Sequence, residues 1–272
     1  MILVVASTKD VASMNIRRQL LEHYDFEETA EKFCGHLVYQ SLNGDKEVKL
    51  VTINEEAIYY QDITEGFDPQ LTIFLSRHSS KSGTPTLSVH TPGNLGVAQK
   101  GGIPKKISVA PAKAMRQALI EMARQRSTLE LNSYKISYEC THHGPSLDVA
   151  TMFVELGSSP AQWKDTKAAE AVAHAAMTAT SENSNRSTVA LGIGGPHYNE
   201  KFTRIALENS IAFGHIIPKY AVSQVDAELI SQCIKRTVEK VDTIVLDWKG
   251  IKGSDKTRLA KAINVGVPVQ KV

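Results

Sequence analysis

The fold of this chain is indicated most clearly where an apparent strand, residues 134–140, runs into Glu139-Cys140-Thr141-His142-His143-Gly144-Pro145. Two other segments are built in the same way, with β-forming residues that end in His, Gly and Pro: 71–83 and 188–198. The carboxyl ends of parallel strands lie at one edge of a sheet, where ligands bind. We therefore expect the three strand ends to meet at one site.

Strands and helices alternate from residue 134 onward at the spacing of βαβ units, which predicts an α/β fold with a mostly parallel sheet flanked by helices. In the N-terminal half, Asn43-Gly44 lies between two runs of β-forming residues and predicts a hairpin. A long basic loop is expected from Ser76 to Lys106, a stretch rich in Ser, Thr, Gly, Pro and Lys. No linker separates these parts, so we predict one domain, 1–272.

The charge of the chain is unevenly distributed, although the net charge is only +2. Residues 1–76 hold six Lys and Arg against thirteen Asp and Glu, whereas residues 77–126 hold nine against one. These counts give net charges of −7 and +8. A basic block that includes a Gly-rich loop indicates a polyanionic partner, with nucleic acid as the first candidate. The arginines of this block could instead form the solvated face of a helix.

Composition excludes several classes of protein. No stretch approaches the ~20 apolar residues of a membrane span, and the apolar start of the chain is too short for a signal-peptide core. The three cysteines, Cys34, Cys140 and Cys233, are far apart and form neither a disulfide framework nor a CxxC metal knuckle. We expect a cytoplasmic protein with no membrane association and no obligate protein partner.

Histidines gather at the predicted strand ends, which hold five of the nine: His78, His142, His143, His197 and His215. Neutral imidazole is a preferred Zn²⁺ ligand, and catalytic zinc commonly takes three protein ligands from His, Asp and Glu. Adjacent residues on a regular strand point to opposite faces, so His142 and His143 can share a ligand only where the strand ends. One of them could equally donate a hydrogen bond to a ligand while its neighbour packs against a helix.

Two acids and a thiol accompany these histidines. Glu155 follows an apolar run, so a partly desolvated carboxylate there could act as a general base or a metal ligand, or form a salt bridge. Glu139 precedes the paired histidines. Cys140 could be a nucleophile, but cysteine is among the most buried residue types and its place on an alternating strand favours the core. The glycines of 192–196 could present backbone N–H groups to an oxyanion, or make a tight turn.

Five motifs in this order resemble the D-aminoacyl-tRNA deacylases of the archaeal and plant type, and the resemblance spans nearly the whole chain. The motifs are Ser76-Arg77-His78-Ser79-Ser80, His90-Thr91-Pro92-Gly93-Asn94, Glu139-Cys140-Thr141-His142-His143-Gly144-Pro145, Gly194-Gly195-Pro196-His197-Tyr198 and Gly214-His215-Ile216-Ile217-Pro218-Lys219-Tyr220. The resemblance implies a phosphorylase/hydrolase-like α/β fold, a requirement for zinc, and hydrolysis of the ester that joins a D-amino acid to tRNA.

On this basis we expect His78, His142, His143 and Glu139 to surround Zn²⁺, which would polarise the ester carbonyl and activate a water. Glu155 is expected to take the proton, and His197 or His215 to orient the carbonyl or the terminal ribose. The expected partner is tRNA charged with a D-amino acid, with its acceptor stem held by Lys81, Lys100, Lys105 and Lys106.

Three alternatives remain open at this point. The first is a metal-free deacylase in which backbone N–H groups position the ester and the 2′-OH of the tRNA assists. The second is a non-catalytic RNA-binding module. The third is a nucleoside phosphorylase.

Overall fold

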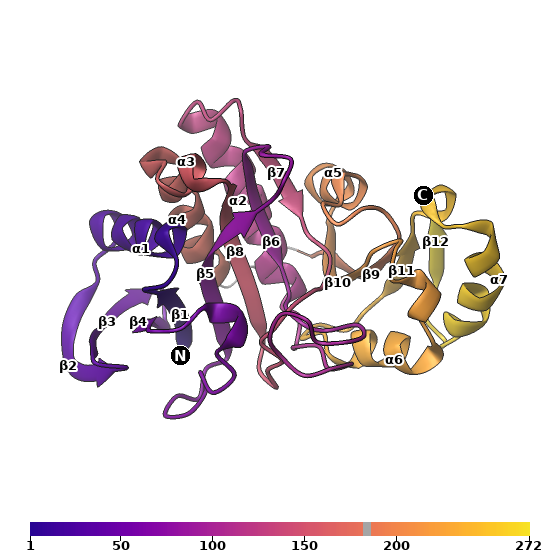
Figure 1. Ribbon diagram of the computed structural model, residues 1–272, viewed down its shortest axis with the longest axis horizontal. Helices are drawn as coiled ribbons and strands as arrows, with labels where there is room; N and C mark the ends of the chain where they lie inside the picture. The colour runs from indigo at the N-terminus through magenta and orange to yellow at the C-terminus, as the bar shows by residue number, and fades with distance from the viewer. Residues whose placement is uncertain (182–185) are drawn as a thin grey trace.

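Two β-sheets lie next to each other in the computed structural model, which describes residues 1–181 and 186–272 (Figure 1). The larger sheet has eight strands in the order β2-β3-β4-β1-β5-β8-β6-β7. Their bounds are β1 (Ile2–Ser7), β2 (Glu27–Phe33), β3 (His36–Asn43), β4 (Lys46–Ile53), β5 (Leu71–Ser79), β6 (Thr86–His90), β7 (Lys135–Tyr138) and β8 (Thr151–Ser158).

The centre of the larger sheet is parallel, as predicted. Strands β4, β1, β5 and β8 are neighbours that all run in one direction. Strand β1 consists of six buried residues, because a strand covered on both faces cannot alternate apolar with polar side chains. Strand β6 runs antiparallel to β8, so its last residue, His90, lies beside Phe153 in the middle of β8. This reversal places a histidine deep in the sheet.

The predicted hairpin is confirmed, since β3 and β4 pair antiparallel and their turn contains Gly44 at φ +60°. A second hairpin joins β2 to β3 through Cys34 and Gly35, both at positive φ. Strand β2 forms the edge of the sheet and is mostly exposed. Its charged residues, among them Glu27, Glu28, Glu31 and Lys32, discourage pairing with another chain.

The smaller sheet contains four strands in the order β10-β9-β11-β12, and all of them are parallel. They are β9 (Thr188–Ile193), β10 (Ile211–Ile217), β11 (Thr243–Leu246) and β12 (Val269–Lys271). The prediction of a mostly parallel α/β fold is therefore confirmed, but the strands are divided between two sheets. The basic loop is also shorter than predicted, because β5 continues to Ser79 and Thr86–His90 forms β6.

Helices cover both sheets (Figure 1). They are α1 (Val11–His23), α2 (Ala112–Thr128), α3 (Pro160–Trp163), α4 (Thr166–Thr180), α5 (Glu200–Glu208), α6 (Ala227–Lys235) and α7 (Gly253–Ala262), with short 3-10 turns at Ala57–Tyr59, Val222–Gln224 and Trp248–Gly250. Within residues 1–181 and 186–272, no helix combines the length and the apolar character that crossing a membrane requires.

Aromatic stacking joins the two sheets through one apolar core. Phe213 on β10 stacks on Phe202 of α5 with ring centroids 4.7 Å apart, and the ring of Tyr138 at the end of β7 meets it edge-on at 6.0 Å. All three side chains are buried, and they belong to the same apolar cluster as the helix-covered face of the larger sheet. Packing at this junction holds the end of β7 against β10 and α5.

We predict that Phe213→Ala lowers the free energy of unfolding by about 3–5 kcal/mol, because it leaves a cavity between the sheets. Leu42→Ala is the matched control, since Leu42 is 70% exposed and its truncation is expected to change stability by less than about 0.5 kcal/mol. Chemical denaturation measures both. Similar small losses in the two variants would show that the junction does not stabilise the fold.

Candidate active site

The three predicted strand ends meet at the junction of the two sheets, and not, as was expected, at one edge of a parallel sheet. Strand β7 runs antiparallel to β5, and β9 belongs to the smaller sheet, so the ends approach the site from different directions. Glu139, just after β7, forms an isolated bridge with Tyr198, and the N–H of Cys140 donates to the carbonyl of His197 at 3.0 Å. The end of β5 joins them through His78, whose Nδ1 lies 3.2 Å from a carboxylate oxygen of Glu139. Residues that are far apart in the chain thus form one site.

The centre of the site is the carboxylate of Glu139, which is 2% exposed. Its Oε1 accepts hydrogen bonds from His78 Nδ1 and from the hydroxyl of Ser88 on β6. Its Oε2 accepts from His197 Nε2 at 2.9 Å. A buried charge is stable only when it is paired and hydrogen-bonded, and these three donors meet that requirement.

Glu155 on β8 lies on the other side of His78, with Oε2 3.4 Å from Nδ1. His78 therefore faces two buried carboxylates with one ring edge, while its Nε2 donates to the hydroxyl of Tyr198. Strand pairing positions Glu155 in the middle of this site, because Glu155 on β8 pairs with Ser76 on β5 on one side and with Ser88 on β6 on the other.

Burial and mutual interaction shift the pKa values of these groups in different directions. Burial works to lower the pKa of His78, but the carboxylates of Glu139 and Glu155 outweigh it and raise that pKa to about 10. Burial works to raise the pKa of Glu139, yet His78 and His197 hold it well below its ordinary value. Burial and the neighbouring charge of Glu139 raise the pKa of Glu155 to about 7. The site thus contains one permanent carboxylate and one that exchanges a proton near neutral pH.

His197 is the second cation beside Glu139. Burial works to lower its pKa, but contacts with Cys140 and Glu139 raise it to about 10. Its Nδ1 lies 3.2 Å from the sulfur of Cys140 and 3.2 Å from the hydroxyl of Tyr220. Cys140 itself is fully buried, in agreement with its expected place in the core.

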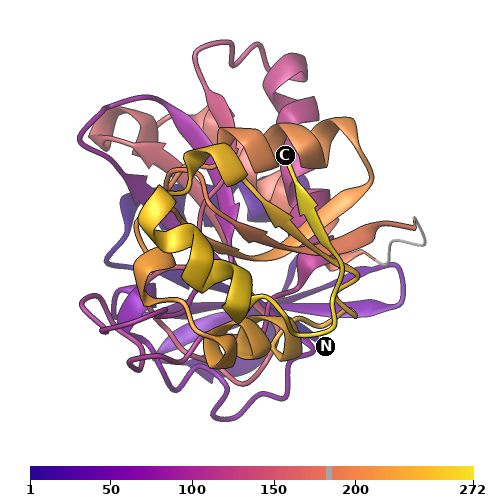
Figure 2. The ribbon, with the colours of Figure 1, turned by 90° about the vertical axis from the view of Figure 1, so that its right-hand side faces the viewer.

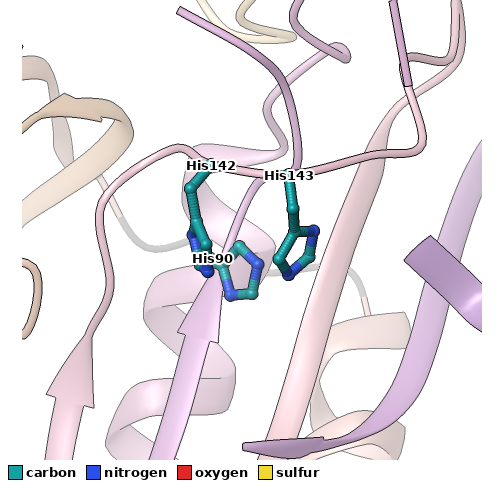
Figure 3. Close-up of side chains that lie close together, drawn as sticks. All are labelled: His90, His142 and His143. Atoms are coloured by element: carbon teal, nitrogen blue, oxygen red, sulfur yellow. The ribbon is translucent and has the colours of Figure 1, made fainter. Parts of the chain in front are cut away.

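A second group of histidines lies beside this network and consists of His90, His142 and His143 (Figure 3). Each offers a ring nitrogen, and the three nitrogens lie within 4.8 Å of one another. The centroids of the His90 and His142 rings are 4.4 Å apart, and those of His142 and His143 are 4.2 Å apart. Figure 3 shows His142 and His143 descending from one loop toward His90 at the tip of β6.

The backbone explains how two adjacent histidines point the same way. His143 has φ +42°, in the left-handed region that a non-glycine residue rarely adopts. This conformation turns the chain at His143, so consecutive side chains no longer point to opposite sides as they do in a regular strand. Strain of this kind is tolerated where the surrounding structure requires it, and it is frequent at functional sites.

The hydrogen bonds of these rings leave nitrogens free for a ligand. His142 Nδ1 donates to the carbonyl of Cys140 at 2.8 Å, and His143 Nδ1 donates to the carbonyl of Gly144 at 2.7 Å. Because a carbonyl only accepts, both Nδ1 atoms carry the proton and both Nε2 atoms hold a lone pair. His90 is buried, and neither of its nitrogens has a hydrogen-bond partner among the residues that the structure describes. Burial, assisted by neighbouring histidines, also keeps the pKa of His90 and of His142 well below the ordinary value.

Three groupings of the described residues could therefore hold a metal ion in this region. The first is His90, His142 and His143; the second is Cys140, His142 and His197; the third is His78, Glu139 and Glu155. The ligand set expected from sequence was His78, His142, His143 and Glu139. The structure places the members of that set in different groupings, which lie side by side.

His215, a predicted site residue, lies beneath the site. It is fully buried, its Nε2 donates to the carbonyl of Arg236 at 3.0 Å, and its Nδ1 lies 3.1 Å from the hydroxyl of Thr141. Both ring nitrogens are occupied, and burial lowers its pKa to about 4. The neutral ring therefore anchors the loop that carries His142 and His143.

Two pockets open onto the site and share four lining residues: Lys100, His142, His143 and His197. One, of about 400 Å³, extends past Leu95, Val97 and Tyr220. The other, of about 480 Å³, extends past Arg77, His78, Glu155 and Tyr198. A substrate with two unlike parts can place one part in each pocket and its reacting bond beside the shared histidines.

The four predicted RNA-binding lysines are distributed unequally around these pockets. Lys100 lines both of them. Lys81 and Lys105 are exposed on loops, and Lys106 pairs with Asp148 at 2.8 Å.

Sequence reasoning did not assign a role to His90, Tyr198 or Ser88. His90 was visible as a histidine at the end of an apolar segment, directly before Thr91-Pro92-Gly93. Its contact with His142 and His143 depends on the antiparallel position of β6, which no local pattern indicates. No sequence pattern indicated a role for Ser88, because serine is common within strands.

The fold and this site are typical of an α/β enzyme that performs acid–base hydrolysis at the carboxyl ends of its strands. The sequence model of the family described as D-aminoacyl-tRNA deacylase matches residues 65–269. The chain is 42% identical to the D-aminoacyl-tRNA deacylase of Thermococcus kodakarensis over 96% of this chain and 95% of that one. It is 34% identical to the one of Methanocaldococcus jannaschii over 99% of both chains. This chain therefore belongs to the D-aminoacyl-tRNA deacylase family, as the motifs predicted.

A solved structure has the same fold. The crystal structure of a conserved protein of unknown function matches with a TM-score of 0.88 and 32% sequence identity, over 100% of this chain and 95% of that chain. The arrangement of two sheets thus recurs in a relative whose structure was determined independently.

We predict that stability depends on pH through Glu155. Its pKa of about 7 in the folded protein exceeds the ordinary 4.5, so the folded state binds the proton more tightly. The resulting stabilisation is complete below pH 4.5 and is lost as the pH rises through 7. Glu155→Gln, studied with chelator present, should therefore gain roughly 3 kcal/mol relative to the unmodified protein between pH 4.5 and 8. Glu208→Gln, at an exposed position of α5, is the control. Parallel stability curves for Glu155→Gln and the unmodified protein would contradict the prediction.

Proposed function

We propose that this protein hydrolyses the ester bond of D-aminoacyl-tRNA and releases the free D-amino acid and the tRNA. The observation that supports this most strongly is the meeting of two pockets at His142, His143 and His197, beside a carboxylate that titrates near neutral pH. An ester of an amino acid with a nucleotide has two unlike parts joined at the reacting bond, which matches two pockets that share a wall. Membership of the family supports the same substrate.

We propose His90, His142 and His143 as the ligands of a zinc ion. Three neutral imidazoles with free nitrogens are a common ligand set for catalytic zinc. The backbone carbonyls that accept hydrogen bonds from His142 and His143 fix the orientation of both rings, as groups that hydrogen-bond to metal ligands commonly do. The unpaired nitrogens of His90 supply the strongest argument, because a buried histidine without any partner is costly. His78, expected from sequence as a ligand, is instead engaged by Glu139, Glu155 and Tyr198.

Zinc at this position would polarise an ester carbonyl and lower the pKa of a water molecule toward ~7. The protein's own groups then handle the proton. Glu155 lines the second pocket and, with a pKa of about 7, accepts a proton from water at neutral pH. His78 lies between Glu155 and Glu139 and stabilises the carboxylate form of both. Glu139 therefore acts as an anchor that keeps His78 and His197 charged and in place.

His197 is proposed to orient the ester. Its ring borders both pockets, and with a pKa of about 10 it is a permanent cation and hydrogen-bond donor at neutral pH. Nε2 is directed to Glu139 and Nδ1 to Cys140 and the Tyr220 hydroxyl, so His197 would orient the ester by its charge and through Tyr220, which lines the first pocket. For His215 we propose a positioning role through Thr141, because neither nitrogen is free to contact substrate.

Chirality is proposed to depend on fit at the shared wall. D and L esters have the same reactive group and differ only in the directions of the side chain and the ammonium group. One pocket offers Leu95 and Val97, whereas the other is polar and offers Glu155 beside Asp10 and Glu56, which pair with Arg77. The apolar side chain of the amino acid suits the first pocket, and the ammonium group suits the second. In the L ester these two groups exchange directions at the α-carbon, so at least one of them lies in the wrong pocket.

For RNA recognition we propose that Lys100 contacts the terminal nucleotide and that Lys81 and Lys105 contact phosphates farther along the acceptor stem. Lys106 contributes less, because Asp148 neutralises it. We also propose that residues 1–272 act as a single domain, since one apolar cluster includes residues of both sheets, and that the protein works in the cytoplasm on charged tRNA.

The decisive experiment compares matched D- and L-aminoacyl-tRNA as substrates, with and without chelator and zinc add-back. We expect release of the D-amino acid only, loss of activity with chelator, and recovery with zinc. Activity that survives chelation would favour a metal-free mechanism assisted by the tRNA. Binding of tRNA without any release of D-amino acid would indicate an RNA-binding module and refute the proposed function.

The metal ligands are tested by zinc content after purification. His90→Ala, His142→Ala and His143→Ala are each expected to reduce bound zinc at least tenfold, as loss of one of three protein ligands implies. His36→Ala, at a histidine that contacts Asn54 away from the pockets, is the control and should retain the metal. If His78→Ala loses zinc while His90→Ala keeps it, the ion belongs with Glu139 and Glu155 instead.

A further inference from the structure

The carboxyl edge of the smaller sheet extends from the active site to a separate pocket. Because its strands are all parallel in the order β10-β9-β11-β12, the residues that follow them form a row. Tyr220 follows β10, His197 follows β9, Trp248 follows β11, and Lys271 ends β12. The first two border the active-site pocket, and the last two lie at the far end of the same edge.

That far end contains a pocket of about 820 Å³ between β11, β12 and α7. Its apolar lining includes Leu246, Trp248 and Val267, and its polar lining includes the lysines 256, 261 and 271. An apolar cavity of this size with a few charged groups is typical of a small-molecule or nucleotide site. In Figure 2 the helix α7 and the strand β12, both yellow, face the viewer, so this region lies on the outside of the molecule.

Among the described residues, no carboxylate pairs with the lysines of this pocket. Lys256 Nζ lies 4.9 Å and Lys271 Nζ 4.2 Å from the centroid of the Trp248 ring. Across residues 1–181 and 186–272, no carboxylate forms an ion pair with Lys256, Lys261 or Lys271, and the adjacent Asp247 is taken by Lys201 at 2.5 Å. Residues 248–272 hold six Lys and Arg against Asp255 alone, a net charge of +5.

We propose that the Trp248 pocket binds an unpaired nucleotide of the RNA substrate. The base would take the place of a lysine ammonium group over the Trp248 ring, and the flanking phosphates would bind the three lysines. The inference rests on the proposed function and adds a second contact region for the same RNA. Aromatic rings that take bases, combined with lysines that take phosphates, are the usual means of binding single-stranded nucleic acid. An RNA whose charged end occupies the active site can extend along the carboxyl edge of the smaller sheet to reach this pocket.

Charge across the rest of the protein favours this path. The segment 1–76, with its net charge of −7, forms the opposite end of the larger sheet and repels RNA. An acidic peptide would match the lysines but would leave the apolar cavity beside Trp248 without a planar occupant. The chemistry of the pocket therefore fits a nucleobase with phosphate.

The test measures binding of labelled, uncharged tRNA by fluorescence anisotropy at several salt concentrations. Lys256→Ala/Lys271→Ala should weaken binding about tenfold and reduce the salt slope by about two, because two phosphate contacts are lost. Trp248→Ala should weaken binding roughly tenfold through loss of stacking. The matched control is Lys249→Ala/Lys252→Ala, which removes the same charge at exposed positions outside the pocket.

Catalysis supplies an independent measurement. For D-aminoacyl-tRNA, the Lys256→Ala/Lys271→Ala variant should raise KM with kcat unchanged, whereas hydrolysis of a D-aminoacyl-adenosine that lacks the rest of the RNA should be unaffected. Equal effects of the two double variants, or no effect of either, would overturn the proposal. Pocket-dependent binding of AMP or of polyglutamate, with tRNA binding intact in the variants, would assign the site to a free nucleotide or an acidic protein instead. Failure of the deacylase proposal would be recognised separately, as absence of D-amino acid release by the unmodified protein.

Discussion

The buried charge of Glu139 is the constraint on which the site depends. A carboxylate that is 2% exposed needs several donors, and it obtains them from three segments that are distant in sequence: Ser88 on β6, His78 at the end of β5 and His197 after β9. Each of these contacts fixes one strand end against another. The same charge helps to keep both histidines protonated, together with Cys140 in the case of His197, and it adds to the larger effect of burial in raising the pKa of Glu155 to about 7. A single desolvated carboxylate thus organises the geometry and sets the protonation state of its neighbours.

The two halves of the site have different electrostatic character for a physical reason. His78 and His197, which hydrogen-bond to Glu139, are held as cations, whereas burial and neighbouring imidazoles keep His90 neutral and also His142, although its Nε2 lies 3.7 Å from Glu139. Cationic imidazoles donate hydrogen bonds, and neutral ones can bind a metal. In the proposed mechanism, proton transfer and metal binding would therefore take place at different histidines of one cluster. The junction of the two sheets makes this possible, because it brings the ends of strands from both sheets together around one carboxylate.

Local patterns were sufficient to predict the hairpin at Asn43-Gly44, the parallel α/β class and the meeting of the strand ends around Glu139. They were insufficient for the division into two sheets, since the alternation of strands and helices is the same in one sheet or in two. They also did not group His90 with His142 and His143. That grouping requires β6 to lie antiparallel beside β8 and His143 to adopt a positive φ, and neither is visible in the order of residues.

The sequence by itself determined which chemistry is available and to which family the chain belongs, because residue types and motif order are properties of the chain alone. It also determined the basic character of residues 77–126 and 248–272. Only the tertiary structure decided which histidines share a site, which are occupied and which remain free. His215 and His90 demonstrate the difference, since both are buried histidines in family motifs. Both nitrogens of His215 are hydrogen-bonded, whereas neither nitrogen of His90 has a partner within residues 1–181 and 186–272. The reason is that hydrogen-bond partners and desolvation arise from contacts between distant segments, and those contacts exist only in the folded chain.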